Sequence, residues 1–260
     1  RKKLIFELHH DLNNESRVIR FLVKYFNFLN SSYIKKIIGI THGVKRVFVK
    51  KHNVNKNKIF VLPSGSSLKI NFSYKHNKKN FKIGYFGSLY ESRGLDLIYE
   101  LAKIDKKNQY YVYGNKKNLK NSQRHIFIKN LNLYNYIPYK KISNKLSEMD
   151  VLLMPYVSPI TVSGDVSDIT NYTSPLKLFD YLSAGKIIIC SSFAVLKEVI
   201  KDKKNAVFIK NYKNVFAWKN EIQKLKYQNN KQIIISKNNF LLSKKYSLAN
   251  RANKILEQII

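Results

Sequence analysis

The sequence predicts an α/β fold in which helices cover parallel sheets, and three observations support this. From residue 81 onward, short apolar runs alternate with stretches whose apolar residues recur at helical spacing. One of these stretches stops at Gly185, as a helix would. A smaller group of strand-like and helix-like segments precedes residue 64. Strands that alternate with helices form parallel sheets, because a crossover between parallel strands usually contains a helix.

The larger, C-terminal part of the chain contains six apolar runs, which we expect to be strands. These runs are Phe81–Phe86, Tyr110–Tyr113, His125–Ile128, Val151–Met154, Ile187–Cys190 and Ala206–Ile209. We expect helices at Leu95–Ile104, Ile142–Met149, Pro175–Ala184 and along the tail Ser236–Ile260. The tail would pack through an apolar face of Phe240, Leu241, Leu248, Ala252, Ile255 and Leu256. Parallel sheets bind ligands at the carboxyl ends of their strands, so the loops there are candidates for a site.

The N-terminal part has fewer elements. We expect strands at Leu4–Leu8, Lys36–Ile40 and Ile59–Pro63, and helices at Arg17–Asn30 and Gly43–His52. Three strands are too few for a domain of this type, so we expect them to be the last strands of a larger α/β domain. Residues 64–80 are rich in Gly, Ser, Asn and Lys, which is typical of a linker.

The chain carries a large excess of positive charge. It has 48 Lys and Arg against 16 Asp and Glu, a net charge of +32. Such a charge attracts nucleic acid, an anionic membrane or phosphorylated small molecules. An AT-rich genome would also produce an excess of Lys, and the sequence leaves both explanations open. A nucleic-acid-binding protein is one alternative, since the chain also has 18 Tyr and 15 Phe. These aromatic residues follow core patterns, so we do not expect nucleic acid as a partner.

Other residue types exclude further classes of protein. The single Cys190 lies in an apolar run, which favours a reduced core residue and a cytoplasmic location. The histidines are scattered and show no metal-ligand spacing, so we expect no metal and no other cofactor. The apolar stretch Val18–Leu29 is interrupted by Arg20 and Lys24. A membrane-spanning helix needs roughly 20 predominantly apolar residues, so we do not expect this stretch to span a membrane.

A glycine-bearing loop follows the first strand of the C-terminal part. Gly87-Ser88-Leu89 leads to Arg93-Gly94 at a helix start. The N–H groups of such a loop and the positive end of the next helix can bind an anion, and a nearby Arg can add a bidentate contact. Glycines in strand-to-helix turns more often serve the backbone conformation, so this loop alone is a weak signal of phosphate binding.

A stronger signal is the segment Ser174–Tyr181, which reads Ser-Pro-Leu-Lys-Leu-Phe-Asp-Tyr. It resembles the donor-site helix of glycosyltransferase family 4, in the variants that read Ser-Pro-Leu-Lys-Leu-Phe-Glu-Tyr. Further segments resemble motifs of that family in the same order: Phe6–His9 its Glu-x-His strand end, Val61–Gly65 its Ile-Pro-Asn-Gly hinge, Gly87–Gly94 its Gly-Arg-Leu…Lys-Gly loop, and Asp150–Tyr156 the strand before the donor pocket. The matches span nearly the whole chain.

The resemblance implies a GT-B fold, with a Rossmann-like nucleotide-sugar domain and part of a second Rossmann-like domain. We expect residues 1–70 to be the remnant of the acceptor-side domain and residues 71–80 to be the linker. Residues 81–240 would form the nucleotide-sugar domain, and residues 241–260 a helix that packs back across both domains. The chain opens with Arg-Lys-Lys directly before a strand, without Met or a signal peptide, so we expect the parent protein to begin earlier.

The resemblance also implies the site residues. The donor would be bound by Gly87, Ser88, Arg93, Gly94, Asp168, Ser174, Pro175, Leu176, Lys177 and Asp180. Arg93 and Lys177 would neutralise the departing diphosphate, and Ser174 would cap the helix that starts at Pro175. Asp180, one methylene shorter than the family's second glutamate, would bind the ribose hydroxyls.

The sequence departs from the family pattern at two positions. The family's first glutamate falls at Tyr172, and the Arg of its glycine loop is Ser88. We expect Asp168 to supply the missing acidic contact. On the acceptor side, His9 corresponds to the family's histidine, with His10 as the alternative in register.

We therefore predict a retaining glycosyltransferase that moves a hexose-type sugar from a nucleotide-sugar to a hydroxyl acceptor. The acceptor would be a glycan or lipid-linked sugar in glycan, lipopolysaccharide or capsule synthesis. The basic surface would hold the enzyme at the inner face of the cytoplasmic membrane. A catalytically inactive remnant of such an enzyme is the other alternative.

Overall fold

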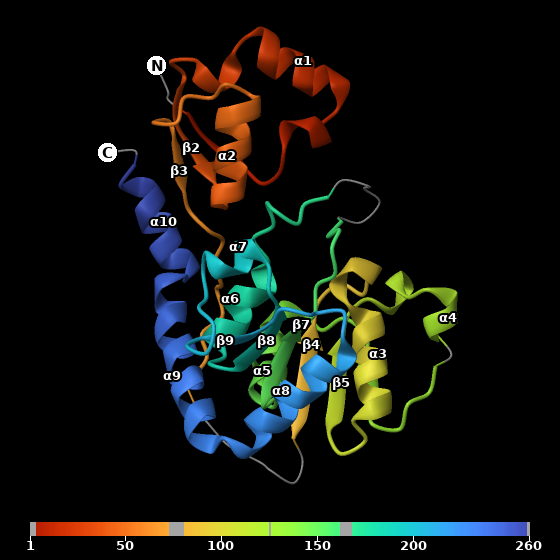
Figure 1. The fold of residues 1–260 in the computed structure, drawn as a ribbon. Coiled ribbons are helices and arrows are strands. Elements are labelled where there is room, and N and C mark those ends of the chain that lie inside the picture. The colour runs from red at the N-terminus through yellow and green to blue at the C-terminus, as the bar shows by residue number, and fades with distance from the viewer. Residues whose placement is uncertain (1–3, 73–80, 125, 162–167, 259–260) are drawn as a thin grey trace.

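The structure is a computed structural model that describes residues 4–72, 81–124, 126–161 and 168–258. It contains two parallel sheets, one formed by the N-terminal part and one by the C-terminal part, as Figure 1 shows. We refer to these parts as the N-terminal unit and the C-terminal unit. Both have the α/β architecture with parallel sheets that the sequence predicts.

The N-terminal unit has three parallel strands in the order β1 (Leu4–Leu8), β2 (Ile34–Gly39) and β3 (Ile59–Val61). Helix α1 (Arg17–Tyr25) lies between β1 and β2, and helix α2 (His42–Lys51) between β2 and β3. The predicted helix Arg17–Asn30 is too long, because Asn27 adopts a left-handed conformation with φ 43°. A separate short 3-10 helix follows at Phe28–Asn30.

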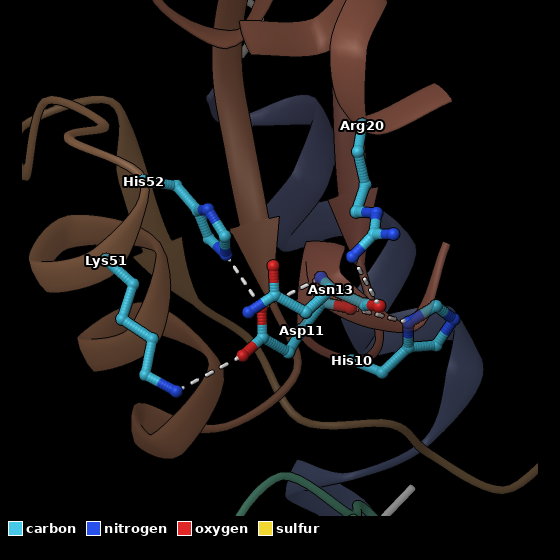
Figure 2. A network of polar contacts seen from close by, with 6 residues as sticks. All are labelled: His10, Asp11, Asn13, Arg20, Lys51 and His52. Carbon is cyan, nitrogen blue, oxygen red and sulfur yellow. Dashed lines mark hydrogen bonds and ion pairs between the residues drawn. The ribbon is translucent and has the colours of Figure 1, made fainter. Parts of the chain in front are cut away.

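A polar network joins the segment after β1 to the end of α2 (Figure 2). The Asp11 carboxylate accepts from the backbone N–H of Asn13 at 3.0 Å and lies 2.7 Å from Nε2 of the buried His52. Lys51 lies 3.5 Å from its other oxygen. Burial works to raise the pKa of Asp11, but these hydrogen bonds and charges outweigh it and hold the pKa below its ordinary value. Asp11 also caps the short 3-10 helix Leu12–Asn14.

The C-terminal unit has six parallel strands in the order β6-β5-β4-β7-β8-β9. Their bounds are β4 (Lys82–Phe86), β5 (Gln109–Tyr113), β6 (Leu131–Tyr134), β7 (Val151–Met154), β8 (Ile187–Ser191) and β9 (Ala206–Ile209). The chain direction across the sheet reverses between β4 and β7. In doubly wound folds, ligands bind at such a point, outside the carboxyl ends of the strands.

One predicted strand, His125–Ile128, is wrong. The third strand is Leu131–Tyr134 instead, and it pairs with Tyr110–Tyr113 of β5. The buried Asn130 donates from its side-chain amide to the carbonyls of Asp105 and Asn108, both at 2.9 Å. These contacts hold the chain at Asn130, whose carbonyl accepts from the N–H of Tyr110 at 2.8 Å where β6 begins.

Helices cover both faces of the C-terminal sheet (Figure 1). The helices between the strands are α3 (Leu95–Ile104), α4 (Asn121–Arg124), α5 (Tyr139–Ser147), α6 (Leu176–Ser183) and α7 (Ala194–Lys197). Short 3-10 helices lie at Glu91–Arg93 and Lys116–Asn118, and α8 (Val215–Tyr227) follows β9. Two buried hydrophobic clusters result, one that includes Phe81, Tyr110 and Trp218, and another that includes Leu152, Leu178 and Ile188.

The C-terminal tail is two helices, α9 (Asn229–Lys245) and α10 (Leu248–Leu256), so the prediction of one helix over Ser236–Ile260 is wrong. At the break, the backbone N–H of Ser66 donates to the Tyr246 carbonyl, and that of Leu248 donates to the Ser66 carbonyl, both at 3.0 Å. The predicted apolar face is also wrong, since Leu241, Leu248 and Leu256 are exposed. Helix α9 instead buries Gln232, Ile235, Ser236, Asn239 and Ser243.

Helix α10 reaches the N-terminal unit (Figure 1). Arg251 Nε donates to the Pro63 carbonyl at 3.0 Å, and its guanidinium lies 2.8 Å from the Glu7 carboxylate. Across the described ranges, none of the helices is long and apolar enough to cross a membrane.

Candidate active site

A cavity of about 720 Å³ lies at the carboxyl ends of β4 and β5 and beside the start of α6. Eight of the eleven predicted site residues line it: Gly87, Ser88, Arg93, Ser174, Pro175, Leu176, Lys177 and Asp180. The C-terminal helix and the segment after β3 complete its wall with Leu248, Gly65 and Ser67.

Gly87 allows a lysine to reach the glycine loop. Its φ of +148° is rare for L side chains, and a Cβ there would lie 2.6 Å from Lys177 Nζ. Gly114, after β5, packs equally closely, because a Cβ on it would lie 2.3 Å from the Gly87 carbonyl oxygen. Glycine at both positions therefore allows this close packing beside the cavity, which both residues line.

Gly94 has a structural role. Its φ is +78°, it stands directly before α3, and a Cβ there would lie 1.7 Å from the Pro155 carbonyl oxygen. It is not among the described residues that line the cavity. The contact of Gly94 with the donor therefore stays a prediction.

Two cations meet at the cavity, as their motifs suggest. Lys177 Nζ donates to Tyr85 Oη at 2.8 Å and lies 4.1 Å from the centroid of that ring. The Arg93 guanidinium lies 5.2 Å from the centroid of Tyr156 and donates to the Thr161 carbonyl at 3.2 Å. Burial, and then the charge of Arg93, lower the pKa of Lys177 well below its ordinary value of 10.5. An anion between these side chains would favour the protonated lysine.

Three tyrosines that the sequence did not single out shape the site. Tyr85 Oη accepts from Lys177 and donates to the Ser88 carbonyl at 2.6 Å, so it ties the lysine to the glycine loop. Tyr181 Oη accepts from the N–H of Phe86 at 2.9 Å and thereby joins α6 to the end of β4. Tyr156 lies beneath both cations. Burial raises the pKa of Tyr156 to about 12, so it stays neutral.

The first turn of α6 faces the cavity. Pro175 is the N-cap residue of α6, and no side chain caps it. The prediction that Ser174 caps this helix is therefore wrong: its hydroxyl instead accepts from the N–H of Ser64 at 3.3 Å. Among the described residues, the N–H groups of Leu176 and Lys177 have no hydrogen-bond acceptor, whereas that of Leu178 donates to the Pro175 carbonyl. Unpaired amides at the positive end of a helix can bind an anion.

Asp180 lies one turn further along α6. Its Oδ1 accepts from Ser66 Oγ at 2.6 Å and from Tyr139 Oη at 2.9 Å. Burial raises the pKa of Asp180, and the two hydrogen bonds counteract this shift. Ser66 and Tyr139 lie far from Asp180 in sequence, and no motif pointed to them. The two contacts use one carboxylate oxygen and leave the other for a ligand.

Three predicted residues lie outside the cavity lining as described. One is Gly94, and the second is Asp168, which accepts from the N–H and hydroxyl of Thr170 and so stabilises its own loop. The third, His9, is largely exposed and lies 3.1 Å from Glu7. Its alternative in register, His10, lies 3.5 Å from Glu15. Residues 162–167, which precede Asp168 in this loop, lie outside the described residues.

A doubly wound sheet, a glycine loop and paired cations at the switch point define an enzyme site for an anionic ligand. The sequence model of the family described as glycosyl transferases group 1 matches residues 66–242. The chain belongs to this family and is a glycosyltransferase with a fold of the GT-B type. No curated protein has significant similarity to the sequence.

Several solved structures share the fold. The structure of Anabaena Alr3699/HepE in complex with UDP matches 99% of this chain and 72% of its own, at a TM-score of 0.76 and 14% identity. Sucrose-phosphate synthase from Thermosynechococcus elongatus matches 97% of this chain and 66% of its own, at a TM-score of 0.71 and 12% identity. WaaG, a glycosyltransferase involved in lipopolysaccharide biosynthesis, matches 96% of this chain and 74% of its own, at a TM-score of 0.64 and 14% identity.

Proposed function

We propose that the chain binds a nucleotide-sugar in the 720 Å³ cavity and transfers the sugar, with retention of configuration, to a hydroxyl group. The observation that carries this proposal is the meeting of Lys177, Arg93 and the unpaired amides of α6 at one wall. A diphosphate leaving group needs such positive charge as the glycosidic bond breaks. These groups would neutralise it without a metal ion.

Asp180 would bind the ribose. Its Oδ1 is occupied by Ser66 and Tyr139, which orients the carboxylate. The other oxygen would accept from the ribose hydroxyls. The UDP complex of the structural neighbour from Anabaena makes a nucleoside diphosphate the natural first ligand to test.

The lining of the cavity is compatible with front-side transfer. Asp180 is the one carboxylate among the described residues that line it. A double-displacement mechanism would need a carboxylate nucleophile next to the sugar, whereas front-side transfer does not. The leaving phosphate would take the proton of the acceptor hydroxyl. His9, held by Glu7, is the acceptor-side group that we would test.

The acceptor would be a glycan or lipid-linked sugar of the cell envelope. Helix α1 supports contact with an anionic membrane on the cytoplasmic side. Its side chains Val18, Phe21 and Tyr25 are exposed, and Arg17 and Lys24 flank them. A Lys or Arg near an anionic leaflet contributes about 1 kcal/mol to binding. Flotation with vesicles that contain phosphatidylserine, compared with neutral vesicles, tests this contact.

A thermal-shift titration tests the donor site. The chain is titrated with UDP, GDP, ADP and CMP at fixed salt, alongside the variants Lys177→Ala and Asp180→Ala. A ligand that binds the native state raises the unfolding temperature by mass action. We expect a shift with one nucleotide diphosphate, lost in both variants and kept in the control Lys103→Ala, whose side chain pairs with Glu100 at the surface. Absence of a shift with every nucleotide would contradict the proposal.

The stereochemistry needs a separate measurement. Once donor and acceptor are known, NMR of the product reports the anomeric configuration. An inverted product would contradict retention and leave the donor site intact.

A further inference from the structure

The N-terminal end of α2 contacts the segment that leads into α6. We call this segment, residues 169–174, the donor loop. Thr41 is buried and caps α2, since its Oγ1 accepts from the N–H of Val44 at 3.2 Å. The same hydroxyl donates to the carbonyl of Tyr172 in the donor loop, also at 3.2 Å. One side chain thus begins a helix of the N-terminal unit and holds a loop of the C-terminal unit.

Gly43 explains how closely the two segments approach. It lies in the first turn of α2 and has no positive φ. Glycine within a helix is less stable than alanine by roughly 1 kcal/mol, so the helix itself gives no reason for it. A Cβ at Gly43 would lie 1.8 Å from the carbonyl oxygen of Asn171. The absent side chain lets the donor loop lie directly against α2.

Tyr172 anchors the loop on the other side. Its ring packs against the hydrophobic cluster of the N-terminal unit, which includes Leu8, Val44 and Phe48. The loop is a compact turn, in which the N–H groups of Tyr172 and Thr173 both donate to the Ile169 carbonyl. A further contact joins the two units at the same place, because the N–H of His42 donates to Glu198 at 2.9 Å.

The loop continues directly into the wall of the cavity. Thr173, Ser174 and Pro175 line it, and the unpaired amides of α6 follow. We propose that Tyr172 is a positioning residue: docked on the N-terminal unit through Thr41 and Gly43, it holds the donor loop and the first turn of α6 in place for the nucleotide. This inference rests on the proposed function. It gives a role to the position at which the family resemblance expects a glutamate.

Four variants of the full chain test the proposal. Gly43→Ala forces the loop away while leaving a residue that favours helix, and Tyr172→Ala removes the anchor. Gly39→Ala is the matched control for the first, because a Cβ there meets no atom closer than 3.6 Å. Tyr172→Phe is the matched control for the second, because it keeps the ring.

Two measurements are compared across the variants. Hydrogen exchange of the peptide 169–178, without ligand, reports whether the loop is docked, and exchange of 44–51 reports whether α2 is intact. Thermal-shift titration with UDP reports the affinity. Loss of one hydrogen bond to a charged group weakens binding by roughly 10-fold or more, so we expect UDP binding at least about 10-fold weaker in Gly43→Ala and Tyr172→Ala. Both controls should match the parent chain.

The outcomes separate this inference from the proposed function. Faster loop exchange with weaker UDP binding and an intact α2 supports the inference. Unchanged loop exchange in Gly43→Ala and Tyr172→Ala overturns it, and so does faster exchange with unchanged UDP affinity. If the parent chain binds neither UDP nor any other nucleotide tested, the proposed function fails, and the exchange data alone decide whether the loop docks.

Discussion

The two units of the molecule are built from the same elements but bury them differently. In the C-terminal unit, helices cover both faces of a six-stranded sheet and two large clusters are buried. In the N-terminal unit, a three-stranded sheet carries one cluster, and α1 has no buried residue. Parallel sheets are normally buried on both faces. The six-stranded sheet and its two clusters therefore support the cavity, whereas the N-terminal unit contributes through specific contacts such as those of α2 with the segment before α6.

The largest expected effect is on the core of the C-terminal unit. Trp218 is fully buried, and its Nε1 donates to the Tyr212 carbonyl at 2.9 Å. Trp218→Ala should lower the free energy of unfolding by about 3–5 kcal/mol, because it leaves a cavity. Urea unfolding measures this loss. It is followed by circular dichroism, because Trp218 is the only Trp and its removal abolishes tryptophan fluorescence. Phe216→Ala, exposed on the same helix, is the control. A loss below about 1 kcal/mol would show that burial of Trp218 contributes little to the stability of the C-terminal unit.

The next effect concerns the donor site. Lys177→Met should weaken UDP binding roughly 10- to 100-fold, because a hydrogen bond to a charged group contributes about 1.5–3 kcal/mol. The variant should be at least as stable as the parent without ligand, since Lys177 is a buried cation without a carboxylate partner among the described side chains. Calorimetry and thermal unfolding measure the two effects. A loss of stability with unchanged UDP affinity would show that Lys177 stabilises the fold and does not bind the diphosphate.

The pH dependence of UDP binding should follow Lys177. The pKa of Lys177 is lowered, so its proton is lost at a pH below 10.5. UDP affinity should fall as the pH rises from 7 toward 10.5, because only the protonated amine attracts the diphosphate. Stability without ligand should show the opposite sign, rising as the pH rises through the lowered pKa, because the unfolded chain then binds more protons. Both trends should disappear in Lys177→Met, and equal trends in both proteins would refute the assignment.

A smaller effect is expected at Asp180. Asp180→Asn should weaken UDP binding by roughly 10-fold, the lower end of what one hydrogen bond to a charged group contributes, because the amide oxygen can still accept a hydrogen bond. The loss should be smaller for 2′-deoxyuridine diphosphate, because that ligand lacks the 2′-hydroxyl and makes an incomplete contact with Asp180 already in the parent chain. Calorimetric titration of both ligands measures the difference. Equal losses for both ligands would place Asp180 away from the ribose.

The smallest effect is expected on α1. Phe21 is 61% exposed, so Phe21→Ser should change the free energy of unfolding by no more than about 0.5 kcal/mol. Phe48→Ala, in the buried cluster of the same unit, should cost about 3–5 kcal/mol. Urea unfolding compares the two. A cost of several kcal/mol for Phe21→Ser would show that α1 is covered in solution.

Much of the fold could be predicted from the sequence because its signals are local. Strands such as Val151–Met154 are short apolar runs, here bounded by Asp150 and Pro155, and α3 occupies Leu95–Ile104 as its helical spacing predicts. The glycine loop and the Ser-Pro-Leu-Lys segment likewise indicated where a phosphate-binding wall would form. These features depend on residues only a few positions apart.

The predictions that the structure contradicts concern features that depend on contacts between residues far apart in the sequence. The side-chain contacts of Asn130 lie at the start of β6, further along the chain than the predicted strand. The backbone hydrogen bonds of Ser66 lie where the tail divides into α9 and α10, near Tyr246. The Ser174 hydroxyl accepts from the backbone N–H of Ser64, which lies far from it in sequence, and does not cap α6. No periodicity in the sequence carries such information.

The order of strands and helices and the two cations of the site could be predicted from the sequence, because apolar periodicity and motif chemistry are properties of short segments. How those segments meet depends on the tertiary structure. It brought Tyr85 to Lys177, Tyr139 to Asp180 and Gly43 to the donor loop. Sheet register and packing set these distances, and a sequence pattern leaves both unspecified.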